Sequence, residues 1–119
     1  MPHKQLEAWK ISMELVKAVY SITSAFPAEE RYGLSQQMRR AAVSIPSNIA
    51  EGAARSSAKE YAHFIAVARG SLAELDTQIR IAQMLGFARD EFAALDLCKK
   101  TGRLLTGLYN KWRQVDSKS

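Results

Sequence analysis

The sequence has very few of the residues that build disulfide frameworks or metal sites. Its single cysteine, Cys98, excludes an internal disulfide, and the two histidines, His3 and His63, leave too few ligands for a structural metal site. No apolar run approaches the roughly 18 residues that a membrane span needs, and residues 1–5 lack the charged-then-apolar pattern of a signal peptide. We therefore expect a cytoplasmic protein that enters no membrane and uses no metal and no cofactor.

Proline, glycine and aromatic residues are also scarce. Three prolines and six glycines exclude a collagen-like chain, while 47% hydrophobic and 24% charged residues exclude a disordered one. The turn signals are too few for a fold of many strands. A chain of 119 residues has the length of one domain and buries a core unaided. The composition predicts a single all-α domain over residues 1–119.

Hydrophobic periodicity predicts four helices, with breaks at Phe26-Pro27 and in two later loops. The helices are expected at about residues 4–25, 33–54, 58–85 and 90–112, with a tail over residues 113–119. Ser57 and Glu60 have the spacing of a capping box, which satisfies free backbone N–H groups at a helix start. Gly86 is the expected C-terminal cap of the third helix.

The first predicted helix is apolar over more than half of its circumference, whereas packing against one core needs a stripe of roughly 100°. Two seams at three- and four-residue spacing make up this surface. The first seam consists of Leu6, Trp9, Met13, Val16 and Tyr20, and the second consists of Ala8, Leu15, Val19, Ile22 and Phe26. Because a lone bundle covers only one such seam, the sequence predicts an oligomer.

The third predicted helix has a face of small residues beside its core stripe. This small-residue face consists of Ala62, Ala66, Gly70, Ala73 and Thr77. Such a face is typical of a close contact with another backbone, or of the high helix propensity of alanine alone.

Pro46 lies inside the second predicted helix, where a proline removes an N–H donor and normally ends a helix. The apolar positions on both sides of Pro46 nevertheless stay within about 60° of one direction on a helical wheel. We therefore predict one helix kinked at Pro46, with the hydroxyl of Ser44 or Ser47 bonding to freed backbone groups. Two short helices in series are the alternative.

Polar side chains recur every three or four residues along one side of the second and of the third predicted helix. The two polar strips consist of Gln37, Arg40, Ser44, Asn48 and Glu51, and of Ser71, Glu74 and Gln78. Packed antiparallel, they are expected to share hydrogen bonds and an Arg40–Glu74 ion pair that fix the register of the helices. The alternative is a catalytic pair of carboxylates, Glu51 and Glu74, in general acid–base chemistry.

The sequence offers little else for catalysis. Di-iron bundles use paired Glu-x-x-His motifs on facing helices, and Glu60 and His63 form one such spacing without a second. Cys98 lies on the apolar face of the fourth predicted helix with no histidine nearby in sequence, as a small core residue does. No glycine-rich phosphate loop is present. We therefore predict that the protein is not an enzyme.

The net charge of +5 comes entirely from the end of the chain, because the first 98 residues are neutral. Four cations fall within about 120° of arc on the fourth predicted helix, opposite its apolar face. This basic stripe consists of Lys99, Lys100, Arg103 and Lys111. It is either a solvated outer face or a surface that meets the phosphates of RNA or DNA. Only Phe92 adds an aromatic ring to that arc, so sequence-specific recognition is not indicated.

Several stretches of the chain resemble one known family. Phe26-Pro27 and Gly33-Leu34 come before residues 37–52, which are the longest matching stretch, and residues 70–75 follow. Together they resemble the signature of four-helix bundle proteins encoded in intervening sequences of bacterial 23S ribosomal RNA genes. The similarity covers nearly the whole chain.

That resemblance implies an up-and-down bundle assembled as a homopentamer, with structural roles for the motif residues and no catalytic residues. Relatives include the accessory variability protein of diversity-generating retroelements, a basic pentamer that binds nucleic acid and a reverse transcriptase. The first hypothesis is therefore a non-enzymatic oligomer that binds RNA or DNA, or a protein working on them, through basic surface. The second is an oligomeric scaffold without a nucleic-acid role. The third, a bundle enzyme, lacks a metal set and an activated nucleophile.

Overall fold

The chain folds into four helices joined by short connections, in a computed structural model that describes residues 2–89 and 91–117, with side chains described through residue 115. The elements in chain order are α1 (His3–Thr23), the 3-10 turn η1 (Ala28–Glu30), α2 (Leu34–Ala53), α3 (Ala58–Met84) and α4 (Phe92–Ser117). The described residues contain no strand. The prediction of an all-α four-helix bundle is confirmed.

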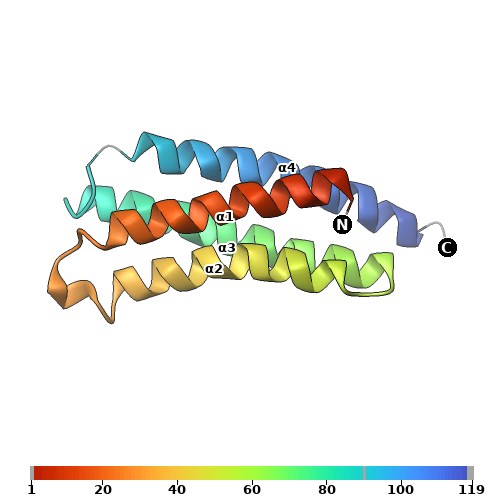
Figure 1. Ribbon diagram of the computed structural model, residues 1–119, viewed down its shortest axis with the longest axis horizontal. Helices are drawn as coiled ribbons and strands as arrows, with labels where there is room; N and C mark the ends of the chain where they lie inside the picture. The colour runs from red at the N-terminus through yellow and green to blue at the C-terminus, as the bar shows by residue number, and fades with distance from the viewer. Residues whose placement is uncertain (1, 90, 118–119) are drawn as a thin grey trace.

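The helices run side by side along the long axis of a molecule of 51 × 24 × 20 Å, and successive connections lie at opposite ends (Figure 1). α1 packs against α2 and α4, and α3 packs against the same two helices. The apolar side of each helix therefore faces two neighbours. The largest fully buried side chains are Leu15, Met38, Ile45, Ile49, Ile65, Leu75, Ile79 and Leu105. Burial of each one stabilises the fold by about 1.5–3 kcal/mol.

The ends of α3 follow from local sequence. Ser57 Oγ accepts a hydrogen bond from the backbone N–H of Glu60 at 3.1 Å, which satisfies one free donor at the helix start. At the other end Gly86 has a positive φ of 80°, a conformation that a side chain disfavours. Its N–H and that of Phe87 bond to the carbonyls of Gln83 and Ala82, which ends the helix in a Schellman motif.

The end of α4 differs from the sequence prediction. The helix continues to Ser117, so the predicted tail over residues 113–119 is wrong for residues 113–117. That stretch holds no glycine or proline, and nothing in it stops a helix. Residue 90, which was predicted to begin the helix, and residues 118–119 lie outside the described residues. The remaining helix ends lie within about two residues of the predicted positions, as is usual for helix boundaries.

α2 runs unbroken through Pro46, so the alternative of two short helices is wrong. Pro46 has no N–H to donate to the carbonyl of Ala42, and its ring is buried with the neighbouring apolar residues. The next residue, Ser47, donates its Oγ hydroxyl to the carbonyl oxygen of Val43 at 2.7 Å, and not to the carbonyl of Ala42 that Pro46 leaves without its donor. The kink at Pro46 stays a prediction.

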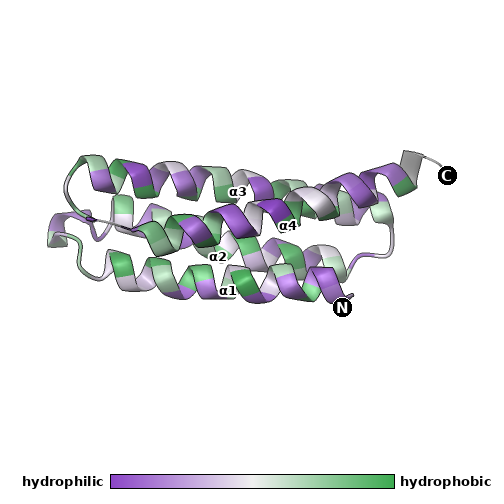
Figure 2. Ribbon diagram, turned by 90° about the horizontal axis from the view of Figure 1, so that it is seen from above, coloured by the Kyte–Doolittle hydropathy of each residue, from purple (hydrophilic) through white to green (hydrophobic). Residues whose placement is uncertain are grey.

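The two apolar seams of α1 have different surroundings. Four residues of the second seam are buried, and Ile22 is half-buried. In the first seam Leu6, Trp9 and Val16 are half-buried, whereas Met13 is 44% exposed. A single bundle therefore covers one seam and leaves much of the other open to solvent. Figure 2 shows green hydrophobic residues at intervals along α1, between purple hydrophilic ones.

Candidate nucleic-acid interface

The basic stripe on α4 is a surface feature. Lys99, Lys100, Arg103 and Lys111 are all exposed. Lys100 Nζ lies 3.1 Å from Asp96 Oδ2, one helical turn earlier, and Lys111 Nζ lies 5.6 Å from the ring centre of Trp112. Lys99 and Arg103 form no ion pair within the part of the chain that the structure describes. These two cations are available to phosphates without breaking an existing pair.

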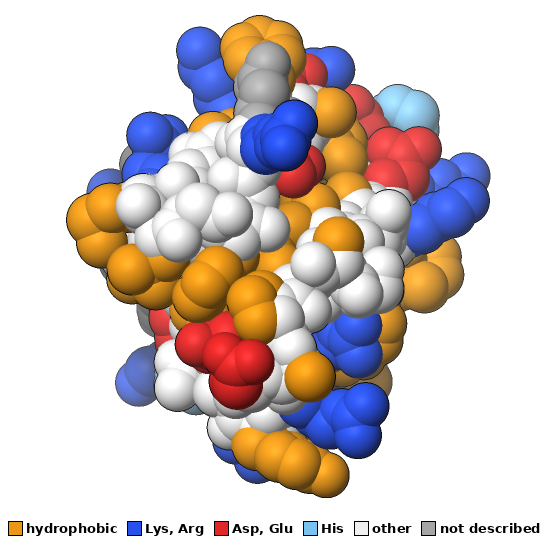
Figure 3. Space-filling model, turned by 90° about the vertical axis from the view of Figure 1, so that its left-hand side faces the viewer, with side chains coloured by type: hydrophobic (Ala, Val, Ile, Leu, Met, Phe, Trp, Pro, Cys, Tyr) orange, Lys and Arg blue, Asp and Glu red, His pale blue; other side chains and the backbone are white. Residues whose placement is uncertain are grey.

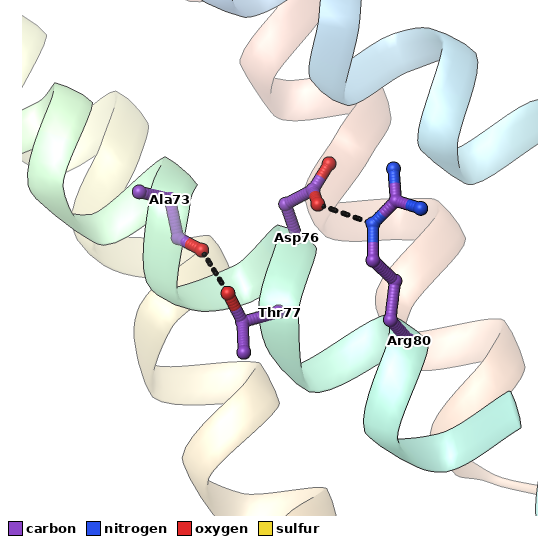
Figure 4. Close-up of polar contacts among 4 residues, drawn as sticks. All are labelled: Ala73, Asp76, Thr77 and Arg80. Atoms are coloured by element: carbon purple, nitrogen blue, oxygen red, sulfur yellow. Dashed lines mark hydrogen bonds and ion pairs between the residues drawn. The ribbon is translucent and has the colours of Figure 1, made fainter. Parts of the chain in front are cut away.

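A groove of about 770 Å³ between α3 and α4 borders the stripe, and it carries charges of both signs. Within α3, Asp76 Oδ1 accepts a hydrogen bond from Arg80 Nε at 2.7 Å, and Thr77 Oγ1 donates to the carbonyl oxygen of Ala73 at 3.0 Å (Figure 4). Asp96 lies on the opposite wall. Because carboxylates line both walls, this groove is a poor site for a phosphate.

Two arginines around Tyr109 extend the cationic surface of α4. Spacing along the sequence does not indicate this cluster. The guanidinium carbons of Arg69 and Arg113 lie 4.9 and 5.6 Å from the centre of the Tyr109 ring. Cation–π contacts of this kind hold the two guanidinium groups in place. Arg69 belongs to α3 and is distant in sequence, so only the packing of α3 on α4 brings it to this surface.

The predicted polar strips meet at one point. Ser71 Oγ of α3 donates to Ser44 Oγ of α2 at 2.9 Å. Asn48 Nδ2 donates to the same hydroxyl at 2.9 Å and to the Ser44 carbonyl oxygen at 2.8 Å. These half-buried groups tie α2 to α3 in one register.

The predicted ion pair of the strips is wrong. Arg40 and Glu74 are both exposed and form no ion pair within the described residues. Glu74 Oε1 instead accepts a hydrogen bond from Gln78 Nε2 at 3.1 Å, one turn along the same helix. Gln37 is exposed as well.

The alternative of paired catalytic carboxylates is also wrong. An alanine Cβ at Gly52 would contact Phe64 and the Tyr61 carbonyl, which places the end of α2 beside the start of α3. Ser44 contacts Ser71 about two helical turns away from that point, earlier in α2 and later in α3. Glu51 and Glu74 are therefore at different levels of the bundle, and Glu51 pairs with Arg55, just beyond the end of α2.

His63 and Cys98 are the remaining candidates for catalysis or metal binding. His63 is exposed, with its ring edge-on to Phe64 at 5.2 Å. The described residues contain no group of three His, Cys, Asp or Glu side chains placed to hold a metal. Cys98 is buried, and burial raises the pKa of its thiol to about 12, so the reactive thiolate is disfavoured.

Among the described helices, none has the length and apolarity needed to cross a membrane.

A second groove, of about 920 Å³, lies between the C-terminal half of α1, η1 and the first half of α2. We call it the arginine groove, because its lining includes Arg31, Arg39 and Arg40, together with Tyr20 and Tyr32. No acidic side chain is among its described lining residues. Figure 3 shows the end of the molecule to which η1 belongs, where Lys and Arg side chains lie around the rim, with hydrophobic side chains and some Asp and Glu side chains between them.

Sequence patterns do not indicate the arginine groove, because Arg39 and Arg40 lie in the motif that resembles the family and Arg31 lies in a break between predicted helices. The available signal was local. Residues 31–40 contain three arginines, an aromatic residue and no acid. The adjoining Glu29 and Glu30 hide this excess when charge is summed over longer segments.

Comparisons with known proteins agree with the resemblance in the sequence. A search among curated proteins finds no match. One family model, described as 23S rRNA-intervening sequence protein, matches residues 4–107. The match covers most of the chain, from α1 into α4, and includes the motif at residues 37–52. The chain belongs to the 23S rRNA-intervening sequence protein family.

Proposed function

We propose that this protein is a non-enzymatic, oligomeric helical bundle that binds nucleic acid, or a protein acting on nucleic acid, through the basic stripe of α4. The observation that carries this proposal is the position of the net charge. Residues 99–119 supply the whole excess of +5, and the four cations of the stripe are exposed on one helix. Charge gathered on one face attracts a polyanion, whereas the same charge dispersed over the surface mainly favours solubility.

The proposal includes self-association, which would repeat the stripe several times in one particle. The half-buried Leu6, Trp9 and Val16 and the exposed Met13 support it, because a partner chain would complete their burial. A homopentamer is the number that the family resemblance suggests. Repetition of a weak site raises overall affinity through effective concentration. A nucleic-acid partner also favours a cytoplasmic location.

Salt titrations of duplex binding test the proposal. The variant carries Lys99→Ala, Lys100→Ala and Arg103→Ala together, and the control carries Lys10→Ala, Lys17→Ala and Lys59→Ala. All six side chains are exposed, so both variants lose the same charge from the surface. Each phosphate neutralised on a duplex contributes about −0.9 to the slope of log affinity against log salt. We expect the stripe variant to lose up to about three units of slope per protomer engaged, and the control to lose little.

An oligomeric scaffold without a nucleic-acid role is the second candidate. The carboxylates beside the stripe favour it, because Asp96 pairs with Lys100 and the Asp76–Arg80 pair lines the adjoining groove. Equal affinities and equal slopes for the wild type and the stripe variant would assign the stripe to solvent. The scaffold would then be the better proposal.

A further inference from the structure

We propose that the arginine groove binds a segment of single-stranded nucleic acid, with phosphates on its arginines and an unpaired base on its tyrosines. The groove is lined by residues of α1, η1, α2 and their connections, and none of its described lining residues belongs to α4. It is therefore separate from the basic stripe, and its test is independent of the function proposed above.

The arginines of the groove are not paired. Arg31, Arg39 and Arg40 form no ion pair with any described carboxylate. Glu30 adjoins Arg31 in the sequence but forms no ion pair with it, and its Oε2 accepts a hydrogen bond from the backbone N–H of Leu34 at 3.1 Å at the start of α2. A guanidinium presents several N–H donors in a planar fork that matches the oxygens of a phosphate. Three such groups on one concave surface favour an anionic ligand.

Arg39 is already held in position for such a ligand. Its Nε donates to Thr23 Oγ1 at 2.8 Å, and its guanidinium carbon lies 4.4 Å from the centre of the Tyr20 ring. Thr23 is only 4% exposed, and its own hydroxyl proton goes to the carbonyl oxygen of Val19 at 2.8 Å. The two terminal nitrogens of Arg39, which carry four of its five N–H donors, make no hydrogen bond within the described residues. Because this side chain is already ordered, binding would cost little further conformational entropy.

The tyrosines favour a nucleic acid over a free phosphate. Tyr32 is 83% exposed in the connection between η1 and α2, and Tyr20 is 44% exposed beneath the Arg39 guanidinium. Exposed rings beside cations are the arrangement on which unpaired bases stack, and stacking tolerates any base. Bases inside a duplex have no free face to offer. The groove should therefore prefer single strands, whereas the stripe, with its charges alone, should bind both forms.

Fluorescence anisotropy with a labelled single strand of about 12 nucleotides, and with the matching duplex, tests this proposal. Three variants probe the groove: Tyr32→Ala, Arg31→Ala with Arg40→Ala, and Arg39→Lys. The side chains of Arg31, Tyr32 and Arg40 are exposed and make no hydrogen bond within the described residues, so their replacement should leave the fold intact. Lys10→Ala with Lys59→Ala is the control, since it removes the same charge as the double arginine variant from exposed sites outside the groove.

We expect Tyr32→Ala to weaken single-strand binding about fivefold or more, the range that loss of one stacked base gives. Loss of Arg31 and Arg40 should lower the single-strand salt slope by up to about 1.4, at about 0.7 per phosphate. Arg39→Lys keeps the charge, yet should weaken binding severalfold, because lysine cannot present a bidentate fork. Duplex affinity should change less than about twofold in the Tyr32 and Arg39 variants.

Any one of the following results would overturn the proposal. The first is a groove variant series that binds the single strand as tightly as the lysine control. The second is an equal loss for single strand and duplex in the Tyr32 variant, or displacement of the strand by inorganic phosphate at equal phosphate concentration and ionic strength. The third is a wild-type protein that binds no single strand. A loss of duplex binding confined to the stripe variant bears only on the earlier proposal, so the two can fail separately.

Discussion

Replacing Gly52 with alanine would test how closely α2 approaches α3. Gly52 is buried near the end of α2, and an added Cβ would lie 3.1 Å from Phe64 Cβ and 3.4 Å from the Tyr61 carbonyl oxygen. The Cβ and the carbonyl are fixed to the backbone of α3, so no flexible side chain can move aside to relieve the contact. The added methyl group would have to push one helix away from the other.

Two effects of opposite sign determine how the Gly52→Ala substitution changes the unfolding free energy. Alanine in place of glycine inside a helix stabilises by up to about 1 kcal/mol, and the gain is smaller here because Gly52 is the next-to-last residue of α2. Overpacking of a close contact costs about 1–3 kcal/mol. We therefore expect the Gly52→Ala variant to lose about 1 kcal/mol of unfolding free energy.

Gly70→Ala is the matched control, because Gly70 lies in the middle of α3 with no atom within 4 Å of an added Cβ. Here only the helix propensity changes, so we expect a gain of about 0.5–1 kcal/mol. Urea unfolding at a fixed protein concentration, with equal m values, should separate the two variants by about 2 kcal/mol.

A Gly52→Ala variant as stable as Gly70→Ala would refute the close approach of the two helices. A loss of stability in Gly70→Ala would instead show that a second chain covers the small-residue face. That face is mostly open in the single chain, since Gly70, Ala73 and Thr77 are exposed.

Three further predictions follow from the surface and the core. Met13→Glu should convert an oligomer to monomers in light scattering, because it places a charge in the uncovered seam, and a wild-type monomer at micromolar concentration would contradict this. Arg40→Ala should cost less than about 0.5 kcal/mol, whereas a loss of 3–5 kcal/mol would indicate a buried charge pair. Cys98 should resist thiol reagents at pH 8 until the protein unfolds, since burial raises its pKa to about 12, and rapid labelling of folded protein would contradict that burial.

The raised pKa of Cys98 also gives the direction of a pH effect. Between the ordinary value of 9.0 and about 12, the folded protein keeps a proton that the unfolded chain releases. The unfolding free energy should therefore fall as the pH rises above about 9, and this part of the decline should be absent in Cys98→Ala.

Much of the fold could be predicted because its determinants are local. Periodicity marked four helices, and the turn at Gly86 and the cap at Ser57 depend on residues within one or two turns. The end of α4 could not be predicted, because no residue after Trp112 stops a helix and periodicity alone gives no boundary. For α1, the wide apolar arc indicated two seams, but only the packing shows which of them the bundle buries.

The polar strips show why spacing is insufficient for a site. Residues three or four apart share a side of a helix, yet spacing says nothing about their depth in the contact or about the level of the partner helix. Ser44 and Ser71 are short and half-buried at the same level, so their hydroxyls meet. Arg40 lies one turn away from Ser44 but is exposed, so water solvates its charge and an ion pair would add little stability.

The net charge of a segment is a poor guide to a site for a related reason. The same reason explains why the two cationic surfaces differ. The first 98 residues are neutral in sum, yet the fold turns Glu30 toward the start of α2 and keeps the neighbouring arginines in the groove. On α4 the sum is strongly positive, yet Asp96 lies within reach of Lys100. A phosphate responds to the charges within about a Debye length, roughly 8–10 Å, and not to the total of a segment. A part of the chain whose charges sum to zero can therefore contain a group of arginines without ion-pair partners.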